Sequence, residues 1–220
     1  MSDEQAALTV IGVIVVAGIA LAVLLVRRSS TLHERLLRLV TTFGWEGPRR
    51  VWWSGAIRGR WRGIDVELHH MARYKGIPER ILLVVKAGFP ARVILKRRTG
   101  GFLSKPLTLF GPPLVEPMNF AGRDQYWIRS DQPMFVERLF SRSEVAPTLE
   151  ANLIAGFDVI DLQSRQLRIL RAIDDSAVKK RFNRPFIKFT RDFELIETIA
   201  SEEWGLAQVI AEGLGMRGYE

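Results

Sequence analysis

The sequence predicts an α+β protein in which an N-terminal transmembrane helix precedes an antiparallel sheet with packed helices. Residues 6–26 carry no charged side chain. Several segments between residues 51 and 129 alternate apolar and polar residues with a period of two, which is typical of half-buried strands. Later segments repeat apolar residues at helical spacing. We therefore divide the chain into a tail and anchor helix, residues 1–28, and an α+β domain, residues 29–220.

The N-terminal apolar run is the basis for the predicted anchor. At a rise of about 1.5 Å per residue, a helix over this run spans roughly 30 Å, which matches the hydrocarbon core of a bilayer. A cleaved signal is disfavoured because Asp3 and Glu4 precede the run, where a signal peptide is basic. Arg27 and Arg28 follow it, so the positive-inside rule places the domain in the cytoplasm and the N-terminus outside. The small residues Gly18 and Ala22 share one helix face, which leaves self-association as an open alternative.

The remaining elements follow from local patterns. Thr31 and Glu34 have capping-box spacing, and a helix from there is expected to end at Gly44. The first two strands are expected to join near Gly59. Ser164 and Arg165 are expected to turn a later hairpin. The expected strands are 51–58, 61–74, 81–86, 92–96, 125–129, 157–162 and 166–172, and the expected further helices are 133–140, 144–154 and 192–214.

Charge and cysteine content limit the classes of partner and of chemistry. All 32 Lys and Arg residues but only 22 of the 24 Asp and Glu residues follow the apolar run, so the domain carries an excess of ten positive charges. Such a surface suits anionic lipid, an acidic protein or nucleic acid, and the predicted anchor favours the first two. The chain has no cysteine, which excludes disulfides, thiolate zinc sites and cysteine nucleophiles.

Two basic segments are the candidate binding sites. Residues 49–63 hold five arginines and three tryptophans without an acid, and residues 80–115 are also free of acids. Arginine with tryptophan suits a membrane interface or nucleic acid, but a strand with buried tryptophans and solvated arginines explains the first segment equally well. The candidate contacts to an anionic surface are Arg27, Arg28, Arg49, Arg50, Arg58, Arg60, Arg62, Lys96, Arg97 and Arg98.

No catalytic, cofactor-binding or metal-ligating residue is predicted. The three histidines are His33, His69 and His70, and the last two are neighbours in an expected strand, so they point to opposite faces. We find no spacing typical of a nucleophile elbow, a zinc protease helix, a dinucleotide turn or a calcium loop.

Two short motifs carry a resemblance to a known group. Residues 55–60, GAIRGR, lie in an early strand, and residues 126–133, YWIRSDQP, lead into a helix. With the order of elements, these motifs resemble a family of uncharacterised bacterial single-span membrane proteins with a domain of unknown function. The resemblance covers residues 32–213 and implies a bacterial inner (cytoplasmic) membrane protein with a cytoplasmic α+β domain. It implies no activity and no site residue.

The sequence therefore favours a membrane-anchored, non-enzymatic adaptor whose basic domain binds the anionic leaflet or an acidic protein partner. The alternative is an enzyme or small-ligand sensor with a pocket between the sheet and the C-terminal helix. Tethering of nucleic acid is the weakest of the three hypotheses.

Overall fold

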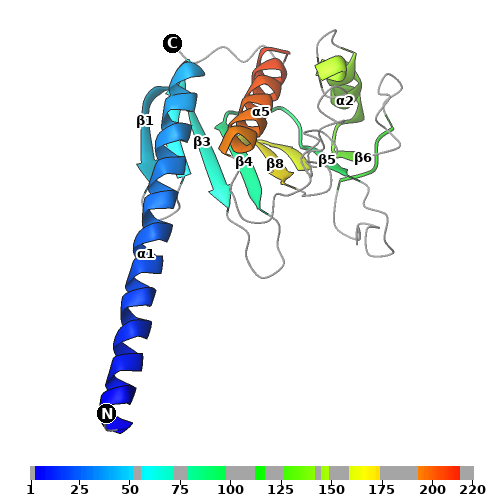
Figure 1. Ribbon diagram of the computed structural model, residues 1–220. Coiled ribbons are helices and arrows are strands. Elements are labelled where there is room, and N and C mark those ends of the chain that lie inside the picture. The colour runs from blue at the N-terminus through cyan, green and yellow to red at the C-terminus, as the bar shows by residue number, and fades with distance from the viewer. Residues whose placement is uncertain are drawn as a thin grey trace.

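A computed structural model describes residues 3–51, 56–71, 79–97, 112–116, 126–141, 145–148, 159–173 and 193–213. Its helices are α1 (Asp3–Thr42), α2 (Pro133–Phe140) and α5 (Phe193–Gly213). Its strands are β1 (Glu46–Val51), β2 (Ala56–Trp61), β3 (Ile64–Met71), β4 (Arg80–Lys86), β5 (Val93–Arg97), β6 (Tyr126–Ser130), β7 (Val159–Gln163) and β8 (Gln166–Ala172) (Figure 1).

The strands form one eight-stranded sheet in the order β1-β2-β3-β4-β8-β7-β5-β6. Strands β1 to β4 pair with their neighbours in the chain, and β7 and β8 form a hairpin. Two pairings join strands that are far apart in the chain: β4 with β8, where Leu83 lies opposite Ile169, and β5 with β7, where Leu95 lies opposite Ile160. All of these pairs are antiparallel, which confirms the predicted antiparallel sheet.

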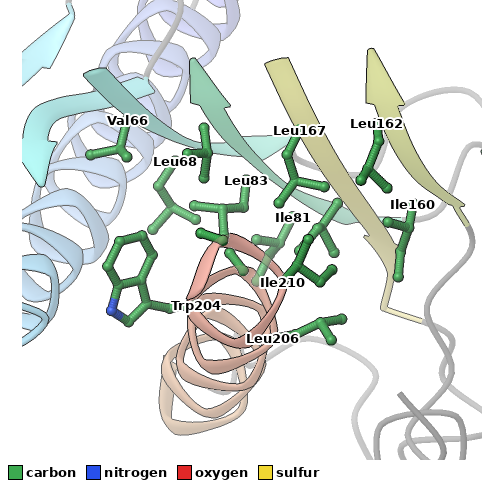
Figure 2. Packing of buried hydrophobic residues seen from close by; sticks show 14 of the residues in the cluster. Val66, Leu68, Ile81, Leu83, Ile160, Leu162, Leu167, Trp204, Leu206 and Ile210 are labelled. Carbon is green, nitrogen blue, oxygen red and sulfur yellow. The ribbon is translucent and has the colours of Figure 1, made fainter. Parts of the chain in front are cut away.

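Helix α5 and the C-terminal half of α1 pack on one face of this sheet, which we call the core face. Every second strand residue points to it, and many of these side chains are less than 3% exposed, such as Val66, Leu83 and Leu167. They meet Trp204 and Ile210 of α5 in a continuous apolar layer (Figure 2). Period-two alternation on the strands and helical spacing on α5 thus produce one shared hydrophobic core.

Trp204 is the aromatic centre of this layer. Its ring stacks on Phe43, directly after α1, with centroids 5.7 Å apart, and meets Trp45 and Trp61 edge-on at 5.4 and 5.1 Å. Trp204 is 3% exposed. One side chain of α5 therefore joins the turn after α1, the residue before β1, and β2.

Ion pairs attach α5 to α1 and to β8. Arg35 of α1 binds Glu197 through two contacts, Nε to Oε1 at 2.7 Å and Nη2 to Oε2 at 3.2 Å. Arg171 of β8 donates from Nη1 to Glu202 at 2.6 Å, and Arg171 is 2% exposed. The Arg171–Glu202 pair is largely buried, and such a pair fixes the position of a helix because breaking it leaves a charge without a partner.

Most predicted elements are confirmed, with shifts of a few residues at their ends. The expected strand 51–58 is wrong, because Val51 ends β1 and Ala56 begins β2. Gly44, at φ +76°, ends α1 as expected, and Ser164 and Arg165 turn the β7–β8 hairpin. The predicted turn at Gly59 is wrong, because Gly59 lies inside β2 and the β2–β3 turn is at Arg62 and Gly63. A Cβ on Gly59 would lie 3.1 Å from the Trp45 ring, so this glycine allows close packing instead of a turn. Residues 145–148 of the expected helix 144–154 are helical, and residues 149–154 lie outside the described part.

The predicted N-terminal transmembrane helix is wrong. Within the residues that the structure describes, no helix is both long and apolar enough to cross a membrane. The chain also lacks the predicted boundary between an anchor and a helix that starts near Thr31, because α1 is one continuous helix of 40 residues. Its C-terminal half packs against β1, β2 and α5, whereas its N-terminal half extends away from the sheet (Figure 1).

Three further predictions depended on the anchor and are contradicted with it. They are the single-pass assignment, the membrane as an integral partner, and the localisation to a bacterial inner membrane with the N-terminus outside and the domain in the cytoplasm.

Replacement of Trp204 by alanine should lower the free energy of unfolding by about 3–5 kcal/mol, because it leaves a cavity among three aromatic rings. Urea unfolding followed by circular dichroism measures this change. Met134→Ala is the matched control, since Met134 is 71% exposed and its loss should cost less than about 0.5 kcal/mol. Equal losses in both variants would contradict the central position of Trp204.

Candidate functional site

The face of the sheet opposite the core face, which we call the polar face, carries most of the charged strand residues. Pairing across the sheet places their side chains on one side, because residues opposite each other in antiparallel strands share a face. The basic residues of this face are Arg49, Arg58, Arg60, Arg80, Lys86, Lys96, Arg129 and Arg168, and the acidic residues are Glu46, Asp65, Glu67 and Asp161. The polar face therefore has twice as many basic as acidic strand residues.

Glu67 of β3 is the centre of the densest charge cluster. Its side chain is 9% exposed, and its Oε1 lies 2.9 Å from Arg58 Nε and 2.6 Å from Lys86 Nζ. Its Oε2 lies 2.9 Å from His69 Nε2. Arg58 and Lys86 are 47% and 45% exposed, so one sunken carboxylate holds two basic side chains that reach the surface.

The pKa of Glu67 reflects these contacts. Burial on its own would raise the pKa. Hydrogen bonds from Lys86 and His69 and the positive charges of Lys86 and Arg58 outweigh burial and lower the pKa below its ordinary value of 4.5. Glu67 is therefore an anion at neutral pH and serves as an internal counter-ion.

The two arginines of β2 have different neighbours. Arg60 lies between two acids, Glu46 of β1 and Asp65 of β3, and its Nε is 3.3 Å from Asp65 Oδ1. Arg58 lies between Glu67 and another base, Arg49 of β1. Positive charge is thus less compensated at Arg58 and Arg49 than at Arg60.

The structure brings together only some of the predicted contact residues. Arg49, Arg58 and Arg60 share the polar face near β2, and Lys96 lies on the same face in β5. Arg50 points to the core face, opposite Ile57.

The other predicted contacts lie elsewhere. Arg62 is in the β2–β3 turn, where it binds Glu212 at 3.2 Å and lies 4.7 Å over the Trp61 ring. Arg27 and Arg28 belong to α1 and Arg97 to β5, but their side chains are outside the described part, as is the whole of Arg98.

Lys86 and Glu67 are the residues of this cluster that sequence reasoning did not select. The alternation in β3 predicted that Glu67 faces away from the core, but only the β3–β4 register brings Lys86 next to it. The available signal was the opposite charge of Glu67 and Lys86 in two consecutive expected strands, residues 61–74 and 81–86.

The region proposed for a ligand pocket, between the sheet and α5, is filled with apolar side chains. Ile81, Leu83, Leu206 and Ile210 are 1–2% exposed there (Figure 2). Among the described residues, no group of three His, Asp or Glu side chains could hold a metal ion.

Of the three tryptophans in the basic segment 49–63, the structure describes Trp61. Trp61 is 5% exposed and belongs to the hydrophobic core, as expected for a strand with buried tryptophans and solvated arginines. Trp52 and Trp53 lie outside the described residues.

Glu67→Gln should lower the free energy of unfolding at pH 7 by about 1–3 kcal/mol, because it removes the anion that Arg58 and Lys86 share. A lowered pKa in the folded state gives stabilisation that is present above pH 4.5 and is lost as the pH falls through the folded-state value. The wild type and the variant should therefore converge in urea unfolding as the pH falls below 4.5. Asp65→Asn is the control, because Asp65 is 60% exposed and contributes little. A difference that does not shrink at any pH below 4.5 at which the protein stays folded would contradict the role of the Glu67 charge.

Comparison with known proteins does not show a family. No protein-family model matches the chain, and no curated protein matches it. Among solved structures, the chain is similar to the mycobacterial trehalose monomycolate transport factor A, TtfA, at 10% sequence identity and a TM-score of 0.46, over 83% of this chain and 96% of that chain. At these values the similarity carries no argument about function. The resemblance to uncharacterised bacterial proteins stays a prediction.

Proposed function

We propose that this chain is a non-enzymatic binding domain whose polar face binds an acidic protein partner. The observation that carries the proposal is that the acid Glu67 lies deeper than the two bases in contact with it. The carboxylate is sunken while Arg58 and Lys86 reach the surface above it, so an approaching molecule meets cations first. Complementary charge of this kind steers association and selects partners.

The residues between the charges favour a protein over nucleic acid. Met71 is 37% exposed, and Leu82 and Leu170 are half-buried on the same face. Apolar side chains among charges suit the mixed surface of another protein. Nucleic acid without sequence preference is bound by stacking on exposed aromatic rings, but Trp45 and Trp61 are in the core and Trp127, on the polar face, is half-buried.

The charge state of Glu67 favours binding over acid–base chemistry. A general acid or base works best with a pKa near the operating pH. The pKa of Glu67 is lowered instead, and its carboxylate is in contact with three basic side chains.

The double variant Arg49→Glu with Arg168→Glu should weaken binding of a fluorescein-labelled, glutamate-rich peptide by roughly thirtyfold, since each reversed charge removes about 1 kcal/mol of attraction. Both residues are exposed on the polar face. Fluorescence anisotropy of the full chain measures the dissociation constant, which should also rise with salt.

The matched control is Arg138→Glu with Arg165→Glu, which makes the same change in net charge at exposed residues of α2 and the β7–β8 turn. The control should bind within about twofold of the wild type. Equal weakening in both double variants, or no peptide binding by the wild type, would overturn the proposal. Tighter binding of a single-stranded oligonucleotide of equal charge would favour nucleic acid as the partner.

A further inference from the structure

Two arginines lie side by side at the β1 edge of the polar face. Arg49 of β1 is directly opposite Arg58 of β2. Like charges opposite each other in a sheet are destabilising, because their Cβ atoms are only about 4.5–5.5 Å apart. Arg49 is exposed, and within the described residues its side chain makes no ion pair or hydrogen bond. An anion between the two guanidinium groups would remove this repulsion.

Arg58 is already oriented for such an anion. Its Nε contacts Glu67 Oε1 at 2.9 Å, while its side chain remains 47% exposed. Glu67 is in turn held by Lys86 and His69. A guanidinium bound through Nε still has donors on its two terminal nitrogens, and these match the geometry of a carboxylate.

Arg60, two residues further along β2, provides an internal comparison. It has the same residue type, strand and face, but acids lie opposite it on both sides, at Glu46 and Asp65. Its charge is compensated within the sheet. At Arg49 and Arg58, in contrast, two bases of the polar face lie directly opposite each other.

We infer that Arg49 and Arg58 form a clamp for one carboxylate of the acidic partner, and that Glu67 is a positioning residue that holds Arg58 in place. This inference rests on the proposed function and deepens it, because it names the contact that selects the partner. The clamp requires the planar guanidinium group, which a lysine does not supply.

The clamp and a purely electrostatic surface predict opposite effects for one substitution. Glu67→Gln removes a negative charge from a basic surface, so Coulomb attraction alone would tighten binding of an acidic peptide. If Glu67 positions Arg58, the same substitution should weaken binding by roughly fivefold, because the arginine loses its ion-pair partner.

The experiment measures anisotropy of the labelled glutamate-rich peptide with the full chain carrying Arg49→Lys, Arg58→Lys, Arg60→Lys or Glu67→Gln. We expect losses of about tenfold for the first two variants, since they keep the charge but remove the fork of donors. Arg60→Lys, the matched control, should change binding by less than about twofold. Arg49→Lys alters only an exposed edge residue, so its result does not depend on a variant with a weakened fold.

The outcomes separate the two proposals. Binding that is sensitive to salt and to Arg49→Glu with Arg168→Glu, but equal for the three lysine variants, overturns the clamp and leaves the proposed function standing. Tighter binding by Glu67→Gln also overturns the clamp. Absence of peptide binding by the wild type overturns both. The second arm of the experiment uses a phosphoserine peptide of equal net charge. If this peptide binds more tightly than the glutamate-rich peptide, and if Arg49→Lys and Arg58→Lys weaken only its binding, a carboxylate is the wrong ligand.

Discussion

The pairing of β4 with β8 is the constraint on which the rest of the structure depends. It joins residues 80–85 to residues 167–172 and so connects the β1–β4 meander to the strands β5 to β8. Helix α5 contacts both β4 and β8, so it covers this junction on the core face. Trp204 then extends the same packing to Phe43, directly after α1. Helix α5 therefore links the β4–β8 junction to the C-terminal end of α1.

The register of the strands also determines which charged side chains lie next to each other on the polar face. Since side chains alternate with a period of two, a slip of one residue between strands would move every apolar side chain to the wrong face. The correct register places Lys86 of β4 and Arg58 of β2 on either side of Glu67. Packing of the core face thus fixes the geometry of the charged cluster, even though no charged side chain of the cluster contributes to the core.

Local patterns account for what the sequence predicted well. The β7–β8 hairpin and the helices at 133–140 and 192–214 depend on residues close in the chain, and the structure confirms them. Gly59 was misjudged because glycine signals a turn, whereas here the Trp45 ring occupies the space of its side chain. The anchor was misjudged because a charge-free run was interpreted on its own, without the second half of α1 that continues it into the domain. The Glu67 cluster depends on strand order and register, which composition and spacing do not contain.

The acids of strand β3 reduce the repulsion between the basic residues of the polar face. This strand carries Asp65 and Glu67 between the bases of β2 and β4, so attraction between neighbouring strands replaces repulsion. An interior strand can be compensated on both sides in this way, but an edge strand has one neighbour only. Strand β1 is such an edge, and its Arg49 lies opposite a base instead of an acid. Charge compensation by the fold therefore ends at this edge, and a partner that supplies a carboxylate there would complete the alternation of charges that β2, β3 and β4 begin.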